Sequence, residues 1–270
     1  MVVQHNMAAS NANRQLGIST NTLSKSTEKL SSGYRINRAA DDAAGLSISE
    51  KMRSQIRGLN KASSNAQDGI SAIQTAEGAL NEAHSILQRM NELATQSAND
   101  TNTIADRTAV QSEVNALTNE LSRIASTSQF NTQNLLDGTF TRKNLQVGAL
   151  EKQKITISIG NMNAKALGVD SLDVKSFTKA GAAMTLIQKA ISKVSGQRSD
   201  LGALQNRLEH TVNNLDNISE NTQTAESRIR DTDMASEMVQ YSATSIIQQA
   251  GQSMLAQANS QTQGVLSLIQ

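Results

Sequence analysis

Apolar residues recur at every seventh position along two long segments of this chain, and this period restricts the possible folds more than any other feature. The first series consists of Met52, Leu59, Ala66, Ile73, Leu80, Leu87 and Ala94. The second consists of Ile187, Val194, Leu201, Leu208 and Leu215. A seven-residue repeat sustained over such a length is typical of α-helices that pack side by side in coiled coils. The sequence therefore predicts long helices at residues 43–98 and 181–229.

Composition supports long helices and excludes several classes of protein. The 270 residues include no proline and no cysteine, and only 2% are aromatic. The absence of proline removes the commonest helix breaker, and the absence of cysteine excludes disulfides and thiolate metal sites. The net charge is +1 with acidic and basic residues interspersed, so neither a nucleic acid nor an anionic membrane is a predicted partner.

Membrane-targeting patterns are missing from the sequence. The first residues lack the basic segment and apolar run of a secretory signal, and no stretch approaches the roughly 20 apolar residues of a membrane span. We therefore expect no membrane insertion and, if the chain is exported, a route that uses no cleaved signal.

Shorter elements lie between the two long helices. A further helix is predicted by the spacing of Val110, Val114, Leu117, Leu121 and Ile124. The short segment SANDTNT joins it to the first long helix, so the two should form an antiparallel hairpin. Isoleucines at 155, 157 and 159 alternate with polar residues and predict a β-hairpin within 140–160. The predicted fold class is mainly α, a long-helix coiled-coil bundle with a small β-hairpin region.

The two ends of the chain carry weaker seven-residue repeats. Their apolar residues are Leu16, Leu23 and Leu30 at one end and Ile247, Met254, Val265, Leu266, Leu268 and Ile269 at the other. We expect the N- and C-terminal helices to pair as a separate inner domain. Their seam is rich in polar residues, while ordering the backbone costs about 1–2 kcal/mol per residue. We therefore predict that both ends are disordered in the free chain and fold against other copies of it.

The segment LSSGYRINRAADDAAGLSIS, residues 30–49, interrupts the helical pattern. Gly33 suits the left-handed residue just past a helix end, and Asp41 and Asp42 suit the start of the next helix. Two adjacent aspartates could also suggest a catalytic acid and base. Their side chains would diverge by about 100° on a helix, so capping is the better interpretation.

Long and distinctive motifs occur in both halves of the chain. The N-terminal half contains LSSGYRINRAADDAAGLSISEKMRSQIRGL and NAQDGISAIQTAEGALNEAHSILQRMNELATQSAND. The C-terminal half contains LGALQNRLEHTVNNLDN, SRIRDTDMASEM and QQAGQSMLAQANSQTQGVLSLIQ. Together they resemble the conserved regions of bacterial flagellins, and the resemblance extends over residues 1–175 and 180–270. It indicates a short flagellin without variable outer domains.

The resemblance implies a function, a location and partners. The chain would be a structural subunit, with no enzymatic activity and no cofactor, that polymerises with its own copies into the flagellar filament for motility. It would be secreted through the flagellar export apparatus without a cleaved signal and would reside in the extracellular flagellum. An export chaperone and the cap and junction proteins of the flagellum are implied as further partners.

The resemblance also implies a division of the chain. Its parts are the N-terminal inner helix 1–33, the spoke linker 34–42, the N-terminal rod part 43–179, the C-terminal rod helix 180–230, and the second spoke with the C-terminal inner helix 231–270. By the same resemblance, residues of the spoke contact neighbouring subunits. We assign this assembly role to Tyr34, Arg35, Ile36 and Asn37, and group Asp41 and Asp42 with them.

A receptor site is implied by the segment LQRMNELATQSAN. It resembles the rod stretch by which many flagellins are bound by the animal Toll-like receptor 5. Position by position, the match assigns receptor contacts to Arg89, Leu93 and Glu113. The first two lie one helical turn apart on a single face. Ordinary packing between subunits is the alternative role for the same residues.

Three other functions remain as alternatives. Some flagellins carry a metalloprotease in their variable insert, but His5, His84 and His210 lie far apart, outside the paired-histidine motif that zinc requires. We therefore predict no catalytic and no metal site. A hook-filament junction protein shares the same plan and assembles in a few copies. A monomeric coiled-coil adaptor is the third alternative.

Overall fold

The computed structural model describes residues 6–269, with side chains described as far as residue 261. The chain divides into two compact units. The central unit is Gln55–Ser219, and the terminal unit comprises the residues up to Ser54 together with those from Glu220 onward. Both boundaries fall within long helices, so each unit is described by itself.

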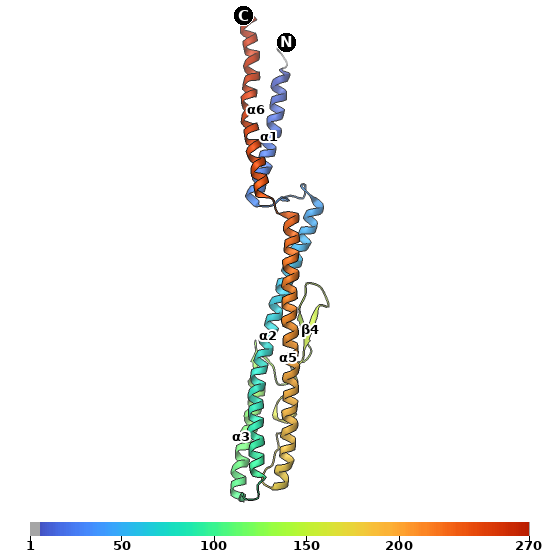
Figure 1. Cartoon of the computed structure of the whole chain (residues 1–270), viewed down its shortest axis with the longest axis vertical. Coiled ribbons are helices and arrows are strands. Elements are labelled where there is room, and N and C mark those ends of the chain that lie inside the picture. Colours follow the sequence, from blue (N-terminus) through green and yellow to red (C-terminus); the bar gives the residue numbers. More distant parts are fainter. Residues whose placement is uncertain (1–5, 270) are drawn as a thin grey trace. The chain divides into compact units, whose positions relative to one another are not determined.

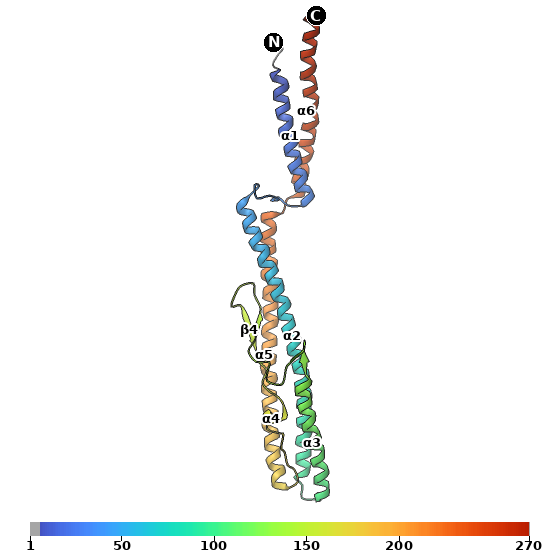
Figure 2. The same ribbon diagram turned by 180° about the vertical axis from the view of Figure 1, so that it is seen from behind.

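Three long helices build the central unit. They are α2 (Ala43–Ser97), α3 (Ile104–Thr127) and α5 (Phe177–Arg230), of which α2 and α5 extend into the terminal unit. Helices α2 and α5 run antiparallel. The Ser63 hydroxyl donates to Asp216 at 3.0 Å, and the Ser219 hydroxyl donates to Asn60 at 2.8 Å. The predicted long helices are confirmed, and both views show them side by side (Figures 1 and 2).

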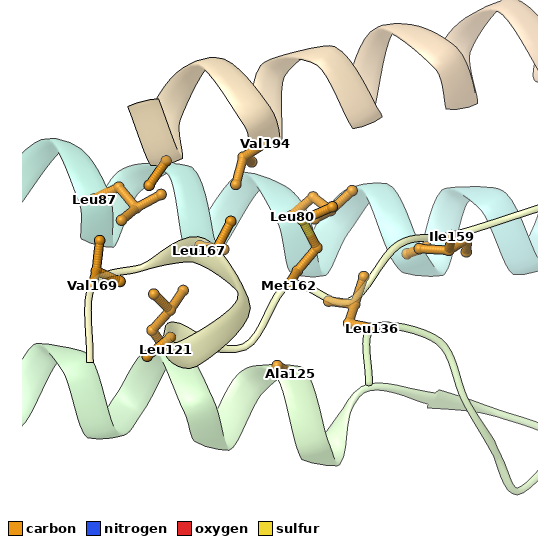
Figure 3. Close-up of a cluster of buried hydrophobic side chains, with 14 of the residues drawn as sticks. Leu80, Leu87, Leu121, Ala125, Leu136, Ile159, Met162, Leu167, Val169 and Val194 are labelled. Carbon is orange, nitrogen blue, oxygen red and sulfur yellow. The ribbon is translucent and has the colours of Figure 1, made fainter. Parts of the chain in front are cut away.

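The seven-residue series form the core of the central unit. From Leu59 to Ala94 and from Ile187 to Leu215, every residue of the two series is at most 5% exposed. Figure 3 shows how the helices share this core, through Leu80 and Leu87 of α2, Leu121 and Ala125 of α3, and Val194 of α5. Burial of apolar surface at about 25 cal/mol per Å² is the main force that holds the three helices together.

Local capping fixes the predicted hairpin of α2 and α3. The Thr103 side chain accepts from the Asp106 backbone N–H, and the Asp106 carboxylate accepts from the Thr103 N–H. This reciprocal pair satisfies two donors that a helix start leaves free. Arg107 bonds back to Asp100 at 3.1 Å, which ties the first turn of α3 to the loop.

Two small antiparallel sheets complete the central unit. Strands β3 (Lys143–Gln146) and β4 (Lys154–Ile157) pair in the register Lys143↔Ile157, which confirms the predicted hairpin. Strands β1 (Gln129–Phe130) and β2 (Gln133–Asn134) form a second, shorter hairpin that the sequence did not predict. Helix α4 (Ala164–Leu167) was also missed, because it is a single turn between Asn163 and Gly168 caps.

Gly69 of α2 lies directly against the side chain of Leu145 in β3. A Cβ at this position would overlap the Leu145 Cδ1, whereas a Cβ at Gly78 would meet nothing within 4 Å. Replacing an interior helix glycine by alanine normally stabilises a protein by about 1 kcal/mol. We predict this gain for Gly78→Ala and a loss of about 1–3 kcal/mol for Gly69→Ala, where overpacking dominates. Urea unfolding of both variants tests the prediction, and equal shifts of the two midpoints would contradict it.

The terminal unit is dominated by α1 (Met7–Ser32) and α6 (Met234–Ile269). They lie side by side and antiparallel (Figures 1 and 2), since Lys29 pairs with Glu237 at 3.5 Å and Gln248 donates to Thr20 at 3.2 Å. The predicted pairing of the end helices is confirmed. Within residues 6–269, no helix is both long and apolar enough to cross a membrane.

Candidate functional site

Helices α1 and α6 meet through small and polar residues. Of their described side chains, only Ser19, Ser26 and Thr244 are buried. Leu16, Leu23 and Leu30 are half-buried at the same interface. Opposite Leu16 stands Gly251, where an added Cβ would lie 3.5 Å from the leucine side chain. The helix pair therefore lacks the apolar core that holds the central unit together.

Helix α6 exposes several of its large apolar residues, whereas Leu255 is half-buried. The exposed fractions are 50% for Met238, 71% for Val239, 67% for Ile246, 53% for Ile247 and 64% for Met254. We call these five residues the apolar face of α6. Exposed apolar residues that gather on one element often mark an interaction site.

Ile247 and Met254 pack at the edge of the α1–α6 interface and not at its centre, where Gln248 and Gly251 face α1. Ile247 and Met254 lie at the rim, where they border an apolar groove of ≈ 250 Å³ together with Leu16 of α1. The C-terminal group Val265, Leu266, Leu268 and Ile269 belongs to α6, but these side chains lie outside the part of the chain that the structure describes.

The spoke linker is held by backbone bonds to the end of α5. Gly33 ends α1 at φ 75°, and its N–H donates to Lys29 O at 2.8 Å. Tyr34 forms an antiparallel bridge with Asp231, and the Arg35 N–H donates to Arg230 O at 2.7 Å. The glycine suits this site because left-handed backbone conformations strain residues that carry a Cβ.

Asp42 caps the start of α2, as predicted, whereas Asp41 bonds backward into the spoke and caps no helix. Asp41 accepts from the Arg38 N–H at 2.9 Å and the Asn37 N–H at 3.3 Å. Asp42 accepts from the Gly45 N–H at 2.8 Å, which satisfies a free donor at the start of α2. A Cβ on Gly45 would lie 2.5 Å from Asp42 Oδ2 and 2.8 Å from Ile36 Cδ1, so a larger residue there would have to displace both side chains.

The structure gives the predicted assembly residues contacts within the chain. Ile36 is 0% exposed, so its predicted contact with a neighbouring subunit is wrong for this conformation. The Tyr34 ring lies 4.7 Å from the Arg230 guanidinium, and the Arg35 side chain donates to Ile229 O. Asn37 donates its side-chain amide to the Ser32 hydroxyl at 2.8 Å. Roles in assembly for Tyr34, Arg35 and Asn37 stay predictions.

Arg230 is a spoke residue that the sequence did not identify. Its side chain is 12% exposed, covers Tyr34 and pairs with Glu50 at 2.7 Å, so it ties the end of α5 to the spoke and to α2. This hydrogen bond lowers the pKa of Glu50 below its usual value. The pKa of Asp41 is also lowered, mainly by the bond from the Arg38 N–H. The only feature of the sequence that pointed to a role for Arg230 was the run of charged residues in RIRDTD.

Acid should loosen the spoke. A carboxyl whose pKa is lower in the folded than in the unfolded chain stabilises the folded state. The full stabilisation is present above the unfolded pKa of about 4 and is lost as the pH falls through the folded pKa. Hydrogen exchange at residues 34–42, corrected for intrinsic rates, should therefore accelerate between about pH 5 and 2. Asp41→Asn and Glu50→Gln should show the looser spoke already at neutral pH. Protection that is independent of pH in the parent protein would contradict the prediction.

The three predicted receptor residues have different environments. Arg89 is exposed and donates to Glu113 at 2.9 Å and to Glu92 at 3.2 Å, so α2 and α3 present one charged cluster. The bond to Glu113 is the largest cause of the raised pKa of Arg89. Leu93 is only 2% exposed and lies in the core, so its prediction as a surface contact is wrong. Because α2 shares its core with both α3 and α5, a wider face of α2 is buried than in a coiled coil of two helices.

The two histidines that the structure describes, His84 and His210, take part in no catalytic arrangement. Among the described residues there is no group of three or more His, Asp or Glu side chains that could hold a metal ion. His84 and His210 lie on α2 and α5, respectively, and His5 lies outside the described residues.

Comparison with known proteins identifies the family. The model of the bacterial flagellin N-terminal helical region matches residues 3–141, and that of the C-terminal helical region matches residues 184–269. A flagellin of Halalkalibacterium halodurans is 55% identical over 271 residues, which cover 100% of both chains. The flagellar filament 33 kDa core protein of Treponema phagedenis is 50% identical over 285 residues, again covering 100% of both.

A solved structure agrees with these matches. The crystal structure of Bacillus cereus flagellin has a TM-score of 0.50 at 31% identity, and the match covers 56% of this chain and 88% of that one. Flagellins form a family of structural proteins, which supports the prediction that this chain is not an enzyme. With both helical regions matched and relatives aligned over the whole length, the chain belongs to the bacterial flagellin family.

Proposed function

We propose that this chain is a structural subunit that polymerises into the bacterial flagellar filament. The observation that carries the proposal is the apolar face of α6, which stays exposed although the helix has a partner in α1. At the α1–α6 interface the buried described side chains are hydroxyls, so the helix pair gains little from its own packing. Further copies of the chain would supply the missing apolar contacts. Full-length similarity to a flagellar filament core protein supports the same role.

Seeded growth tests this function directly. Short fragments of filament are added to the purified chain, and electron microscopy follows their length. A filament subunit should extend the seeds until the free chain is consumed. Growth that stops after a few added copies would indicate a junction protein, and an unchanged monomer would indicate an adaptor.

The export route and the accessory partners belong to the same proposal. A filament outside the cell requires its subunits to leave the cytoplasm. We expect export through the flagellar apparatus without cleavage, helped by an export chaperone and by the cap and junction proteins. Intact mass of the secreted chain checks the absence of cleavage.

The charged cluster of Arg89, Glu92 and Glu113 favours a second role, binding by Toll-like receptor 5. Arginine is enriched among the residues that contribute most to protein–protein binding. The ion pair with Glu113 pre-orients the guanidinium, which lowers the entropy lost on binding. Soluble monomer should bind, and filament should bind poorly if packing between copies covers this surface.

Substitution of Arg89 tests the receptor site. Arg89→Ala should weaken binding of the monomer to the receptor by at least about tenfold, because an anchor residue contributes roughly 2 kcal/mol or more. Arg123→Ala is the matched control, since Arg123 is also exposed and pairs with Glu120 three positions away. Equal affinity of the Arg89 variant and the parent, measured by surface plasmon resonance, would show that the cluster serves no receptor.

A further inference from the structure

Six of the described methionines are either clearly exposed or clearly buried, while Met52 and Met184 are half-buried. Met7 of α1 is 76% exposed, and Met234, Met238 and Met254 of α6 are 46%, 50% and 64% exposed. In the central unit, by contrast, Met90 and Met162 are 0% and 3% exposed. A thioether reacts with peroxides according to its exposure. Oxidation should therefore distinguish the terminal helices from the core.

From this contrast we infer that the exposed methionines of α1 and α6 are separate oxidation sites, and that their oxidation blocks assembly of the free subunit. The inference rests on the proposed filament function, because Met238 and Met254 belong to the apolar face of α6 that would contact other copies of the chain. Met254 borders the apolar groove with Leu16 and Ile247, and Met238 lies on the apolar face itself. These side chains are therefore accessible before assembly and are expected to be buried after it.

The reaction is a two-electron oxygen transfer from hydrogen peroxide. The methionine sulfur attacks one peroxide oxygen, the O–O bond breaks, and an S–O bond forms. The second oxygen takes up the proton of the first and leaves as water, so sulfur is oxidised and peroxide reduced. The product is a polar sulfoxide in place of an apolar thioether. A surface that gains stability from apolar burial loses that gain at each modified position.

The experiment uses the full chain as monomer. It is treated with dilute hydrogen peroxide, the peroxide is removed, and peptide mass spectrometry measures the sulfoxide at each methionine. The four exposed methionines should react well before Met90 and Met162. Elongation of filament seeds by the treated chain should fall by about tenfold or more, because one lost apolar contact is already worth that factor. Methionine sulfoxide reductases should restore growth.

Leucine substitutions provide the decisive variants. The chain with Met7, Met234, Met238 and Met254 all replaced by leucine keeps similar apolar volume and should elongate seeds equally before and after peroxide. Met162→Leu is the matched control and should stay sensitive. Normal growth of the oxidised parent, equal oxidation of Met90 and Met254, or peroxide sensitivity of the four-leucine variant would each overturn the inference. Failure of the untreated parent to grow would instead refute the filament function.

Discussion

Deletion of residues 261–270 should abolish growth on filament seeds while the central unit stays folded. The deleted segment contains Val265, Leu266, Leu268 and Ile269. Each apolar side chain of this kind contributes about 1.5–3 kcal/mol when it is fully buried. Even half of that sum corresponds to a more than hundredfold loss in the affinity of a subunit for the filament end.

The central unit should be unaffected by this deletion because its core is formed within Gln55–Ser219. Circular dichroism and urea unfolding report on that core, and sedimentation reports on the polymer. Ile246→Glu should act in the same direction, since it places a charge on the apolar face of α6. Gln249→Glu adds the same charge to an exposed polar position of α6 and is its control. Filaments of normal length from the truncated chain would remove the proposed role of the C-terminal end.

The sequence was most informative where one residue spacing was repeated many times. The series from Leu59 to Ala94 and from Ile187 to Leu215 could be recognised because each buried position reinforces the next. The two-residue strands β1 and β2 and the single turn α4 gave no such repetition. Positive φ angles at Asn131 and Thr132 bend the chain between β1 and β2, and only the turn-rich composition was visible there.

The candidate site was less predictable, because weak repeats do not fix which helix face is buried. In α6, the series with Ile247 and Met254 is more apolar than the neighbouring series with Thr244 and Gly251, yet the second faces α1. Close approach of two helices favours small residues, and the larger ones remain outside. Leu93 of α2 was misassigned in the same way, since it belongs to the buried core cluster.

Limited proteolysis should clearly distinguish the free subunit from the polymer. In the monomer, both ends should be removed and a stable core near residues 43–229 should remain. The physical reason is that the α1–α6 pair buries hydroxyls such as Ser19, Ser26 and Thr244 where the central unit buries leucine and isoleucine. Helices held by so little apolar area open locally far more often than a packed core does.

The polymer should protect the same ends, because neighbouring copies would cover the apolar face of α6. A protease of broad specificity is required, since the sequence beyond Arg230 contains no lysine or arginine for trypsin. Fragment masses would be compared at equal protease ratios before and after seeded growth. Ends that resist cleavage in the monomer as well as the core does would show that α1 and α6 are stable without neighbours. In that case, the exposed apolar face of α6 would not be explained by self-assembly.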